Sequence, residues 1–214
     1  MVKGKMSQNH KPKTVYWLDN ILYLNITNRC SNNCYFCFKR YKQGVGGFNL
    51  KLTHEPTVEE ITTELDEVLR IRSWDGLVFC GFGEPMERLE TLLEVVRWAR
   101  KHYGRPLKIR VDTNGHGFVL NPGKDVVMEL KAAGVEKVSV SLNAGDRETY
   151  LEICRPTFPE AYEAVHDFVR KAKLLLEVEV TAVRLPEVDL VKAQAVADSL
   201  GVKLKVREYI PCFY

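Results

Sequence analysis

The chain has 214 residues, which is enough for one domain with a full-sized core. Its 31 basic and 28 acidic side chains leave a formal net charge of +3, too small to predict a nucleic-acid or acidic-membrane partner. No segment carries the run of about 18 apolar residues that a membrane helix needs, and the first residues lack the apolar core of an export signal. We therefore expect a cytoplasmic protein whose six cysteines are free thiols or metal ligands.

The chain divides into an N-terminal tail and lead-in, residues 1–20, and a single predicted domain, residues 21–214. In this domain short β-type runs alternate with longer helical patterns, which is typical of βαβ units and a parallel sheet. Strands are predicted at residues 21–27, 76–81, 107–113, 137–142, 177–184 and 203–209. Helices are predicted at residues 58–70, 89–103, 125–133, 159–173 and 190–200. Two of them begin with a capping-box pattern, Thr57-Val-Glu-Glu60 and Thr157-Phe-Pro-Glu160.

The predicted strands alternate between apolar and polar side chains and do not form unbroken apolar runs. In the third strand one face carries Leu107, Ile109 and Val111, and the other carries Lys108, Arg110 and Asp112. Helices between parallel strands can cover only the apolar faces, because covering the other face would desolvate charges. The predicted α/β fold is therefore a partial (β/α)6 barrel of parallel strands with helices outside and a polar lumen. A flat sheet with one solvated face is the alternative.

Three cysteines stand within eight residues, in the stretch Cys30-Ser-Asn-Asn-Cys34-Tyr-Phe-Cys37. Thiolates are soft ligands that select zinc or iron–sulfur clusters, and structural zinc normally takes four ligands. Three thiolates on a cubane cluster would instead leave one iron open to a small molecule. The spacing therefore favours a [4Fe–4S] cluster, and a zinc loop or a set of reduced core thiols is the alternative.

This C-x3-C-x2-C stretch resembles the cluster loop of the radical SAM superfamily, in which an aromatic residue precedes the third cysteine, as Phe36 does here. The resemblance implies that Cys30, Cys34 and Cys37 are the metal ligands of a [4Fe–4S] cluster. It also implies that S-adenosylmethionine chelates the open iron. One electron would then cleave S-adenosylmethionine to a 5′-deoxyadenosyl radical, which abstracts hydrogen from an unidentified substrate.

A second motif follows the second predicted strand, at the carboxyl edge where parallel α/β folds bind ligands. The stretch Cys80-Gly-Phe-Gly-Glu-Pro85 resembles the Gly-Gly-Glu motif of the family, with Phe82 in the place of the first glycine. The resemblance implies that the Glu84 carboxylate accepts from the methionyl amine. The expected cofactor-binding residues of this motif are Gly81, Phe82, Gly83 and Glu84.

Later strand ends complete the predicted cofactor site. Asn114 lies in a Thr-Asn-Gly turn that is common in the family, and ordinary turn chemistry is an equal alternative for it. Ser141 and Asn143 end the fourth strand, where the family binds the ribose hydroxyls, and both offer donors and acceptors. At the end of the sixth strand Arg207 is expected to favour the methionyl carboxylate. The adenine is expected to pack nearby, on Tyr209, Ile210 and Pro211.

Basic side chains outnumber acidic ones on the inward faces of the third, fifth and sixth predicted strands. The basic ones are Lys108, Arg110, Lys203, Lys205 and Arg207, and the acidic ones are Asp112 and Glu179. Such a surplus favours anions, either the methionyl carboxylate or an anionic substrate. The alternative is that these charges pair with one another at the barrel floor.

The remaining cysteines and histidines receive mostly structural interpretations. Cys80 is predicted to be a small core residue. Cys154 and Cys212 stand alone, and a role for Cys154 in radical chemistry is the minor alternative to an unreactive thiol. His116 differs from the other histidines because it lies beside the predicted site.

Two features of the loop after the cluster motif have alternative interpretations. The basic residues Lys39, Arg40 and Lys42 are either a solvated face or a docking patch for an acidic electron donor such as flavodoxin or ferredoxin. The stretch Gly44-Val-Gly-Gly47 is either a mobile cover or a linker.

Over most of its length the chain resembles a small radical SAM subgroup that is associated with TatD-type nucleases. The matching stretches end at Cys30, Pro85, Asn143 and Tyr209 and also include Tyr150 and Cys154. This resemblance implies a functional link to a TatD-type nuclease but no assigned substrate. The alternatives to a radical SAM enzyme with its own substrate are an activase that places a radical on a partner protein and a non-catalytic zinc or iron–sulfur module.

Overall fold

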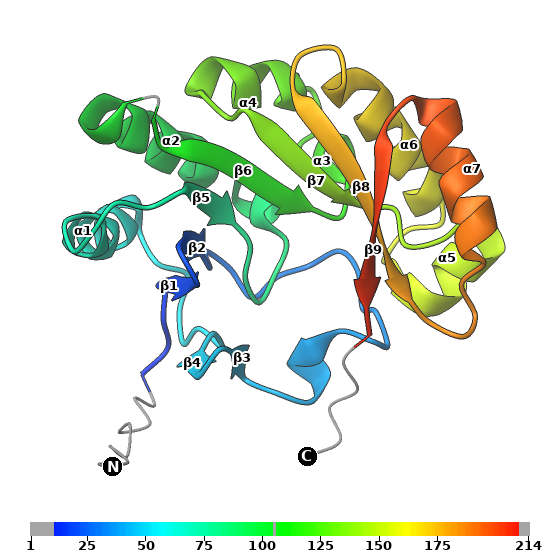
Figure 1. The fold of residues 1–214 in the computed structure, drawn as a ribbon, viewed down its shortest axis with the longest axis horizontal. Helices are drawn as coiled ribbons and strands as arrows, with labels where there is room; N and C mark the ends of the chain where they lie inside the picture. Colours follow the sequence, from blue (N-terminus) through cyan, green and yellow to red (C-terminus); the bar gives the residue numbers. More distant parts are fainter. Residues whose placement is uncertain (1–10, 105, 210–214) are drawn as a thin grey trace.

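One curved sheet organises the computed structural model, which describes residues 11–104 and 106–209 (Figure 1). In these residues the sheet has seven strands in the order β1-β2-β5-β6-β7-β8-β9. The strands are β1 (Val15–Leu18), β2 (Ile21–Leu24), β5 (Gly76–Phe79), β6 (Lys108–Thr113), β7 (Lys137–Ser141), β8 (Glu177–Arg184) and β9 (Lys203–Glu208). The helices are α1 (Val58–Leu69), α2 (Leu89–Tyr103), α3 (Gly117–Leu120), α4 (Val126–Ala133), α5 (Arg147–Cys154), α6 (Ala161–Ala172) and α7 (Leu190–Leu200).

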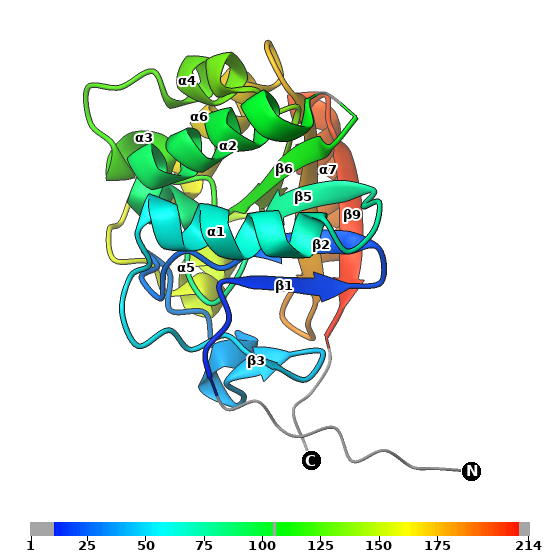
Figure 2. The same ribbon diagram turned by 90° about the vertical axis from the view of Figure 1, so that its left-hand side faces the viewer.

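The predicted partial (β/α)6 barrel is confirmed. Strand β2 and strands β5 to β9 are parallel to one another and neighbour one another in sequence order. The helices α1, α2, α4, α6 and α7 connect them along the convex side of the sheet (Figures 1 and 2). Within the described chain, β1 and β9 form the two edges of the sheet and do not pair with each other, so the barrel is open.

The alternating strand pattern explains which face of the sheet the helices cover. On the face that the helices cover, six apolar side chains of the first three parallel strands are at most 1% exposed, namely Leu22, Leu24, Leu77, Phe79, Ile109 and Val111. Helix α1 meets this face with Ile61 and Leu65, which are both fully buried. Burial of each such side chain contributes about 1.5–3 kcal/mol, so this face fixes the side on which the helices pack.

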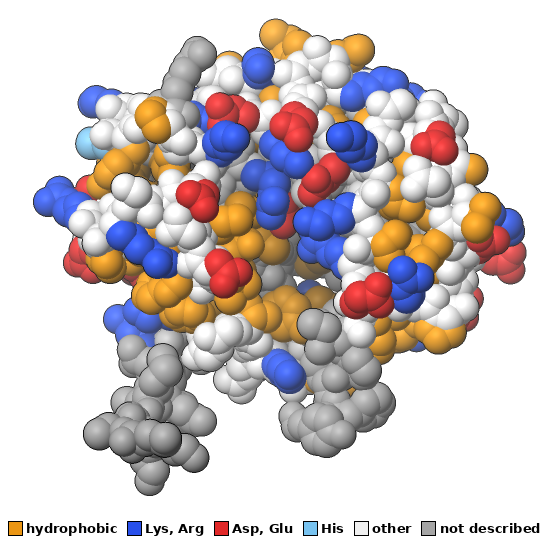
Figure 3. All heavy atoms as spheres, viewed as in Figure 1, with side chains coloured by type: hydrophobic (Ala, Val, Ile, Leu, Met, Phe, Trp, Pro, Cys, Tyr) orange, Lys and Arg blue, Asp and Glu red, His pale blue; other side chains and the backbone are white. Residues whose placement is uncertain are grey.

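The concave face of the sheet is polar, as predicted, and many of its charges are paired (Figure 3). Asp112 contacts Arg110 at 2.7 Å and Arg207 at 3.8 Å. Lys137 contacts Glu179 at 2.7 Å. The other basic side chains predicted for this face are exposed, namely Lys108, Lys203 and Lys205. The predicted positive surplus is therefore reduced by pairing, and its attraction for anions stays a prediction.

The prediction that Cys80 is a core residue is wrong, because the thiol lies on the concave face. Val78 of β5 is in register with Arg110 of β6, and Cys80 follows Val78 on the same side of the strand. The residue is partly exposed, and its thiol is close enough to Asp112 and Arg207 to interact electrostatically with both. Phe79 points the opposite way and is fully buried.

The lead-in and the glycine-rich stretch form elements that the sequence patterns did not predict. Strand β1 lies within the lead-in and pairs antiparallel with β2. The glycine-rich stretch begins a hairpin of β3 (Gly44–Val45) and β4 (Phe48–Asn49), so the interpretation as a linker is wrong, whereas the interpretation as a mobile cover stays a prediction. Phe48 packs against Tyr16 and Trp17 of β1, with ring centroids 5.9 and 4.9 Å apart, and this contact holds the hairpin on the sheet.

Only one of the two predicted capping boxes forms. Thr57 and Glu60 exchange both hydrogen bonds at the start of α1. Helix α6 begins instead after Glu160, with no side-chain cap, because the chain around Pro159 forms a turn. We expect Thr57→Ala to lower the free energy of unfolding by about 1 kcal/mol, and Thr157→Ala to change it little. Urea unfolding of the two variants tests these two predictions. An equal loss of unfolding free energy in both variants would contradict them.

Part of the predicted adenine site lies outside the described residues. Ile210, Pro211 and Cys212 belong to that part of the chain, and Tyr209 is partly buried just after β9. In the described part of the chain, no helix combines the length and the apolar character needed to cross a membrane.

Candidate cofactor site

The three clustered cysteines lie in the loop between β2 and the short 3-10 helix η1 (Phe38–Arg40), below the open side of the sheet in Figure 1. Cys30, Cys34 and Cys37 are all partly buried free thiols. Burial raises the pKa of Cys30 to about 12 and also raises that of Cys37. The backbone N–H of Asn32 donates to the Cys30 sulfur, and the backbone N–H of Lys39 donates to the Cys37 sulfur. Both hydrogen bonds favour the thiolate and therefore oppose the increase in pKa that burial causes. The loop thus already points amide donors at two of its sulfurs.

The end of α5 holds this loop in place through backbone hydrogen bonds. Asn33 N–H donates to the Cys154 carbonyl at 3.0 Å, and Tyr35 N–H donates to the Ile153 carbonyl at 3.1 Å. The last carbonyls of a helix have no partner within the helix, so they are available to a neighbouring segment. Helix α5 was not predicted, and this contact explains how it contributes to the site.

The side chain of Arg40 is hydrogen-bonded to the cysteine loop. Its guanidinium donates to the Cys34 carbonyl at 2.9 Å and to the carbonyl and side-chain oxygens of Asn33 at 3.0 and 2.7 Å. Arg40 and Lys42 are exposed and Lys39 is partly buried, and the partners of Arg40 are uncharged, so the docking patch of all three residues stays a prediction.

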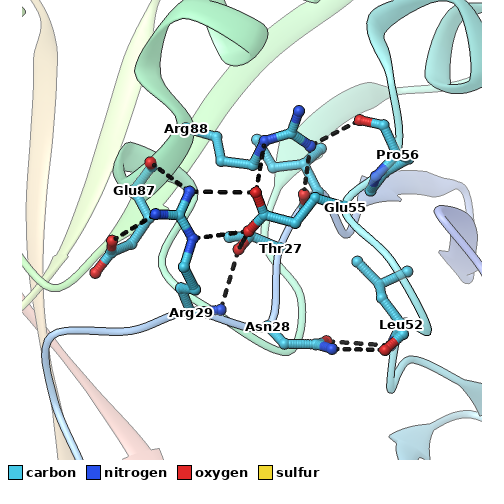
Figure 4. Close-up of polar contacts among 9 residues, drawn as sticks. Thr27, Asn28, Arg29, Leu52, Glu55, Pro56, Glu87 and Arg88 are labelled. Atoms are coloured by element: carbon cyan, nitrogen blue, oxygen red, sulfur yellow. Dashed lines mark hydrogen bonds and ion pairs between the residues drawn. The ribbon is translucent and has the colours of Figure 1, made fainter.

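A charged network fixes the segment that leads into Cys30 (Figure 4). Glu55 accepts from Thr27 at 2.6 Å and from Arg29 at 2.8 Å, and Arg88 approaches its second oxygen at 3.4 Å. Burial opposes ionisation of Glu55, but the donors from Arg29 and Thr27 outweigh it and lower the pKa of this carboxyl. Arg88 also donates to the backbone carbonyl of Ile26 at 2.9 Å, so the network is tied directly to the backbone before the loop.

The Gly-Phe-Gly turn approaches the protein's own backbone closely. Gly81 lies against Asn25, and the Phe82 N–H donates to the Asn25 side-chain oxygen at 2.8 Å. The Phe82 ring meets Phe38 edge to face, with centroids 5.8 Å apart. Phe82 thus joins this turn to the segment that directly follows Cys37.

Glu84 is a buried carboxylate that ties the Gly-Phe-Gly turn to the end of β6. It is 3% exposed and accepts from Thr113 Oγ1 at 2.8 Å, from Asn114 N–H at 2.6 Å and from Met86 N–H at 3.1 Å. Burial raises its pKa to about 7 although all three of these donors favour the carboxylate. The carboxylate therefore positions Asn114, and only part of its accepting capacity remains for a ligand.

Glu84→Gln is expected to change how the stability of the metal-free protein depends on pH. The folded-state pKa of about 7 lies above the usual 4.5, so the folded protein holds this proton more tightly. That stabilisation is complete below pH 4.5 and is lost as the pH rises through 7. At 1.36 kcal/mol per pKa unit, the unfolding free energy of the variant relative to wild type should rise by about 3 kcal/mol between about pH 4.5 and 8. Thermal unfolding of both proteins across this range tests it, and a difference that is constant with pH would contradict it.

Asn114 and His116 belong to a buried hydrogen-bond chain behind the cysteine loop. Asn114 Nδ2 donates to Ser31 Oγ at 2.8 Å, and Ser31 Oγ lies 2.8 Å from His116 Nδ1. His116 Nε2 lies 3.0 Å from the Tyr150 hydroxyl, which also accepts from Asn32 at 3.2 Å. Burial lowers the pKa of His116 to about 4, so the ring is neutral at pH 7. The tautomer of this ring decides whether Ser31 or Tyr150 donates to it.

The other predicted site residues differ in how closely they approach the loop. Asn143 is buried after β7 with a φ of 61°, and its Nδ2 lies 3.3 Å from the Cys154 sulfur. Ser141 is half-buried opposite Thr181 of β8. Arg207 is 3.5 Å from Ser139 and belongs to the charged concave face. The Phe36 ring packs edge to face on its neighbour Tyr35, with centroids 5.7 Å apart.

The donor set of the loop fits a cubane cluster. Cys30, Cys34 and Cys37 are three free thiols on one short loop, and in such a cluster each thiolate would bind a different iron. The amide donors to two of the sulfurs also fit, because cluster sulfurs accept hydrogen bonds of this kind.

Comparison with known proteins gives relatives by sequence. The chain is 26% identical over 199 residues to the AdoMet-dependent heme synthase of Methanosarcina barkeri, an alignment that covers 92% of this chain and 50% of that protein. It is 30% identical over 151 residues to the probable GTP 3′,8-cyclase of Saccharolobus islandicus, with 71% of this chain and 42% of that protein covered. The chain thus spans half or less of the length of these relatives.

Solved structures and a family model agree with the fold. The structure of SuiB from Streptococcus suis bound to S-adenosylmethionine matches with a TM-score of 0.65 at 15% identity, over 89% of this chain and 42% of that one. The model of the radical SAM superfamily matches residues 24–195. Members of this superfamily bind a [4Fe–4S] cluster and S-adenosylmethionine. Because the match covers most of its length, the chain belongs to the radical SAM superfamily.

Proposed function

We propose that this chain is a radical SAM enzyme whose cluster ligands are Cys30, Cys34 and Cys37. The observation that carries the proposal is the cysteine loop, in which three free thiols are held at one edge of an open barrel, with Asn114 close behind them. When bound, a reduced [4Fe–4S] cluster supplies the electron that cleaves S-adenosylmethionine to a 5′-deoxyadenosyl radical. That radical abstracts hydrogen from an unidentified substrate in the lumen.

The strand-end residues are proposed to bind and orient S-adenosylmethionine. Glu84 Oε2 accepts from Asn114 alone among the described residues, which leaves capacity for the methionyl amine. Asn143 uses Nδ2 on Cys154, which leaves Oδ1 to accept from a ribose hydroxyl. The remaining proposed contacts are the backbone of Gly81, Phe82 and Gly83, the side chains of Ser141, Arg207 and Tyr209, and the ring of Phe36.

Anaerobic turnover tests the proposed function. Wild-type protein is reconstituted with iron and sulfide, reduced with dithionite and mixed with S-adenosylmethionine, and 5′-deoxyadenosine is followed by chromatography. We expect slow formation that requires dithionite. Stoichiometric zinc without a cluster, or a cluster that yields no 5′-deoxyadenosine, would contradict the proposal.

We further propose that the chain belongs to the TatD-linked subgroup and acts in the reducing cytoplasm. The stretches that carry that resemblance include Tyr150 and Cys154, which lie beneath the cysteine loop. A small acidic donor such as flavodoxin or ferredoxin would dock near Lys39 and Lys42, which flank the guanidinium of Arg40 in sequence. Flavodoxin-dependent cleavage should then fall steeply with salt, while dithionite-dependent cleavage should not.

A further inference from the structure

The buried ring of His116 bridges the cysteine loop and α5. Its Nδ1 lies 2.8 Å from Ser31 Oγ in the loop, and its Nε2 lies 3.0 Å from the Tyr150 hydroxyl on α5. Ser31 Oγ also accepts from Asn114 Nδ2 at 2.8 Å. The Tyr150 hydroxyl also accepts from Asn32 Nδ2 at 3.2 Å. All of these residues are at most 6% exposed, so a hydrogen bond lost here leaves a buried polar group without a partner.

A neutral imidazole is suited to this place because it has one donor and one acceptor. Each hydroxyl accepts from an amide, so it still has its own proton to donate and a further lone pair with which to accept. In one tautomer Ser31 donates to the ring and the ring donates to Tyr150, and in the other tautomer both directions are reversed. Both tautomers keep both hydrogen bonds, so the ring joins the two hydroxyls in either state.

The fold leaves the His116 ring little room to move. Its neighbours in sequence are Gly115, which adopts a φ of 84°, and Gly117. A Cβ atom at Gly117 would lie 2.6 Å from the Met86 sulfur, so the backbone here packs tightly against the core. The ring itself meets Phe158 edge to face, with centroids 4.8 Å apart. A ring that is held in place in this way can in turn hold the side chains that it binds.

The residues that the ring holds directly follow the first proposed cluster ligand. Ser31 and Asn32 come after Cys30 in the motif, and the ring contacts Ser31 directly and Asn32 through the Tyr150 hydroxyl. Asn114 Nδ2, which donates to Ser31, also lies 3.9 Å from the Cys30 sulfur. Loss of the ring nitrogens would therefore release the segment that determines where Cys30 lies.

We propose that His116 is a positioning residue that fixes residues 31–32 and thereby holds the cysteine loop in the geometry that the cofactors need. It acts through Ser31 and, by way of Tyr150, through Asn32. Groups one step removed from metal ligands commonly orient those ligands. The inference rests on the proposed function, because it requires the loop to hold a cluster. It gives a role to a residue that lies about 80 positions away from the cysteine motif.

Three changes in this network and one outside it test the proposal. His116→Phe keeps an aromatic ring and removes both nitrogens. In His116→Asn the side-chain amide occupies the place of Nδ1, so the contact with Ser31 is retained. Tyr150→Phe removes only the far hydroxyl, and these last two variants serve if His116→Phe does not fold. The matched control is His166→Phe, because His166 is a partly buried histidine of α6 whose Nε2 has no partner among the described residues.

The first measurement is made on the metal-free proteins without denaturant. Thiols are alkylated with iodoacetamide, and the labelling of each cysteine is followed by tandem mass spectrometry. We expect Cys30 and Cys34 to react about tenfold faster in His116→Phe than in wild type, because two hydrogen bonds are lost. In His116→Asn and Tyr150→Phe, which each lose one, the increase should be about threefold. Cys80 lies outside the loop and should react at the wild-type rate in every variant, and the control should match wild type throughout.

The second measurement is made after anaerobic reconstitution and reduction. S-adenosylmethionine is titrated into each protein, and the change in the electron paramagnetic resonance spectrum of the cluster gives the concentration for half-maximal binding. We expect His116→Phe to need about tenfold more S-adenosylmethionine than wild type, and His116→Asn to stay within about threefold. A lower yield of cluster would not by itself change this concentration, because the signal is normalised to the cluster present.

Each result has a distinct meaning. Equal acceleration at Cys30, Cys34 and Cys80 would show a global loss of stability, and unchanged rates would show that the ring does not hold the loop. Either result, or an unchanged requirement for S-adenosylmethionine in His116→Phe, would overturn the inference and leave the cluster assignment standing. A wild-type protein that assembles no cluster would instead overturn the proposed function, and the inference with it.

Discussion

Cys37→Ala is expected to abolish cluster assembly and to reduce 5′-deoxyadenosine formation to the level without protein. Each thiolate of a cubane cluster holds a separate iron, so the loss of one thiolate leaves two of the four irons without a protein ligand. Iron content should fall from about four per chain to near zero.

The matched control is Cys80→Ala, which removes the same side chain from a position outside the loop. Cys80 lies on the concave face beside Asp112, so its loss should leave the iron content of the reconstituted protein unchanged. Iron analysis and the absorbance of the cluster are measured on both variants in parallel. A Cys37→Ala protein that retains a full cluster would contradict the assignment of the ligands.

The fold could be predicted from the sequence largely because strand alternation is a local signal. Leu107, Ile109 and Val111 alternate with charges, and the structure places these three in the core. Helix α5 was missed because its eight residues carry weak periodicity, with Tyr150, Ile153 and Cys154 as its fully buried side chains. The β3–β4 hairpin was missed because its stability comes from a contact with β1 that is distant in sequence.

The cysteine loop could be predicted because its residues are contiguous in sequence. The residues that hold this loop in place could not be predicted. Glu55 lies in a polar stretch in which no sequence motif marks it as part of the site, yet its carboxylate binds both Arg29 and Arg88. Ser31 lies inside the motif but is indistinguishable from a loop serine until the fold brings His116 to it. Such contacts join segments that are far apart in sequence, so only the folded structure reveals them.

The glycines of the second motif were predicted to bind the cofactor, and the structure shows a second reason for glycine at these positions. Glycine allows a ligand to approach the backbone closely, which is the usual reason for glycine in a ligand-binding turn. In the structure Gly81 and Gly83 both pack against the protein's own segment 25–29. A requirement for glycine at position 83 therefore exists even without a cofactor, and it leads to the second large prediction.

Gly83→Ala is expected to lower the free energy of unfolding by about 3 kcal/mol or more and to prevent cluster assembly. A Cβ atom at this position would lie 2.6 Å from the Thr27 carbonyl oxygen and 2.8 Å from the carbonyl carbon of Asn28, and it would also collide with the Arg29 carbonyl. These are backbone atoms, so no rotation of a side chain relieves the contact. The segment cannot move freely either, because Glu55 binds both Thr27 and Arg29. Any displacement would carry Cys30, the next residue, with it.

Gly76→Ala provides the matched comparison, because this glycine also has an ordinary backbone conformation. Its Cβ would meet the Lys108 carbonyl oxygen at 3.1 Å, a single tight contact in β5 that a small shift relieves. The reduced entropy of the unfolded chain offsets part of that cost, so the expected change is about 1 kcal/mol or less. Urea unfolding of the two metal-free variants, followed by iron analysis after reconstitution, separates the cases. Equal stability losses, or a full cluster in Gly83→Ala, would show that the approach of this turn to residues 27–29 does not control the loop.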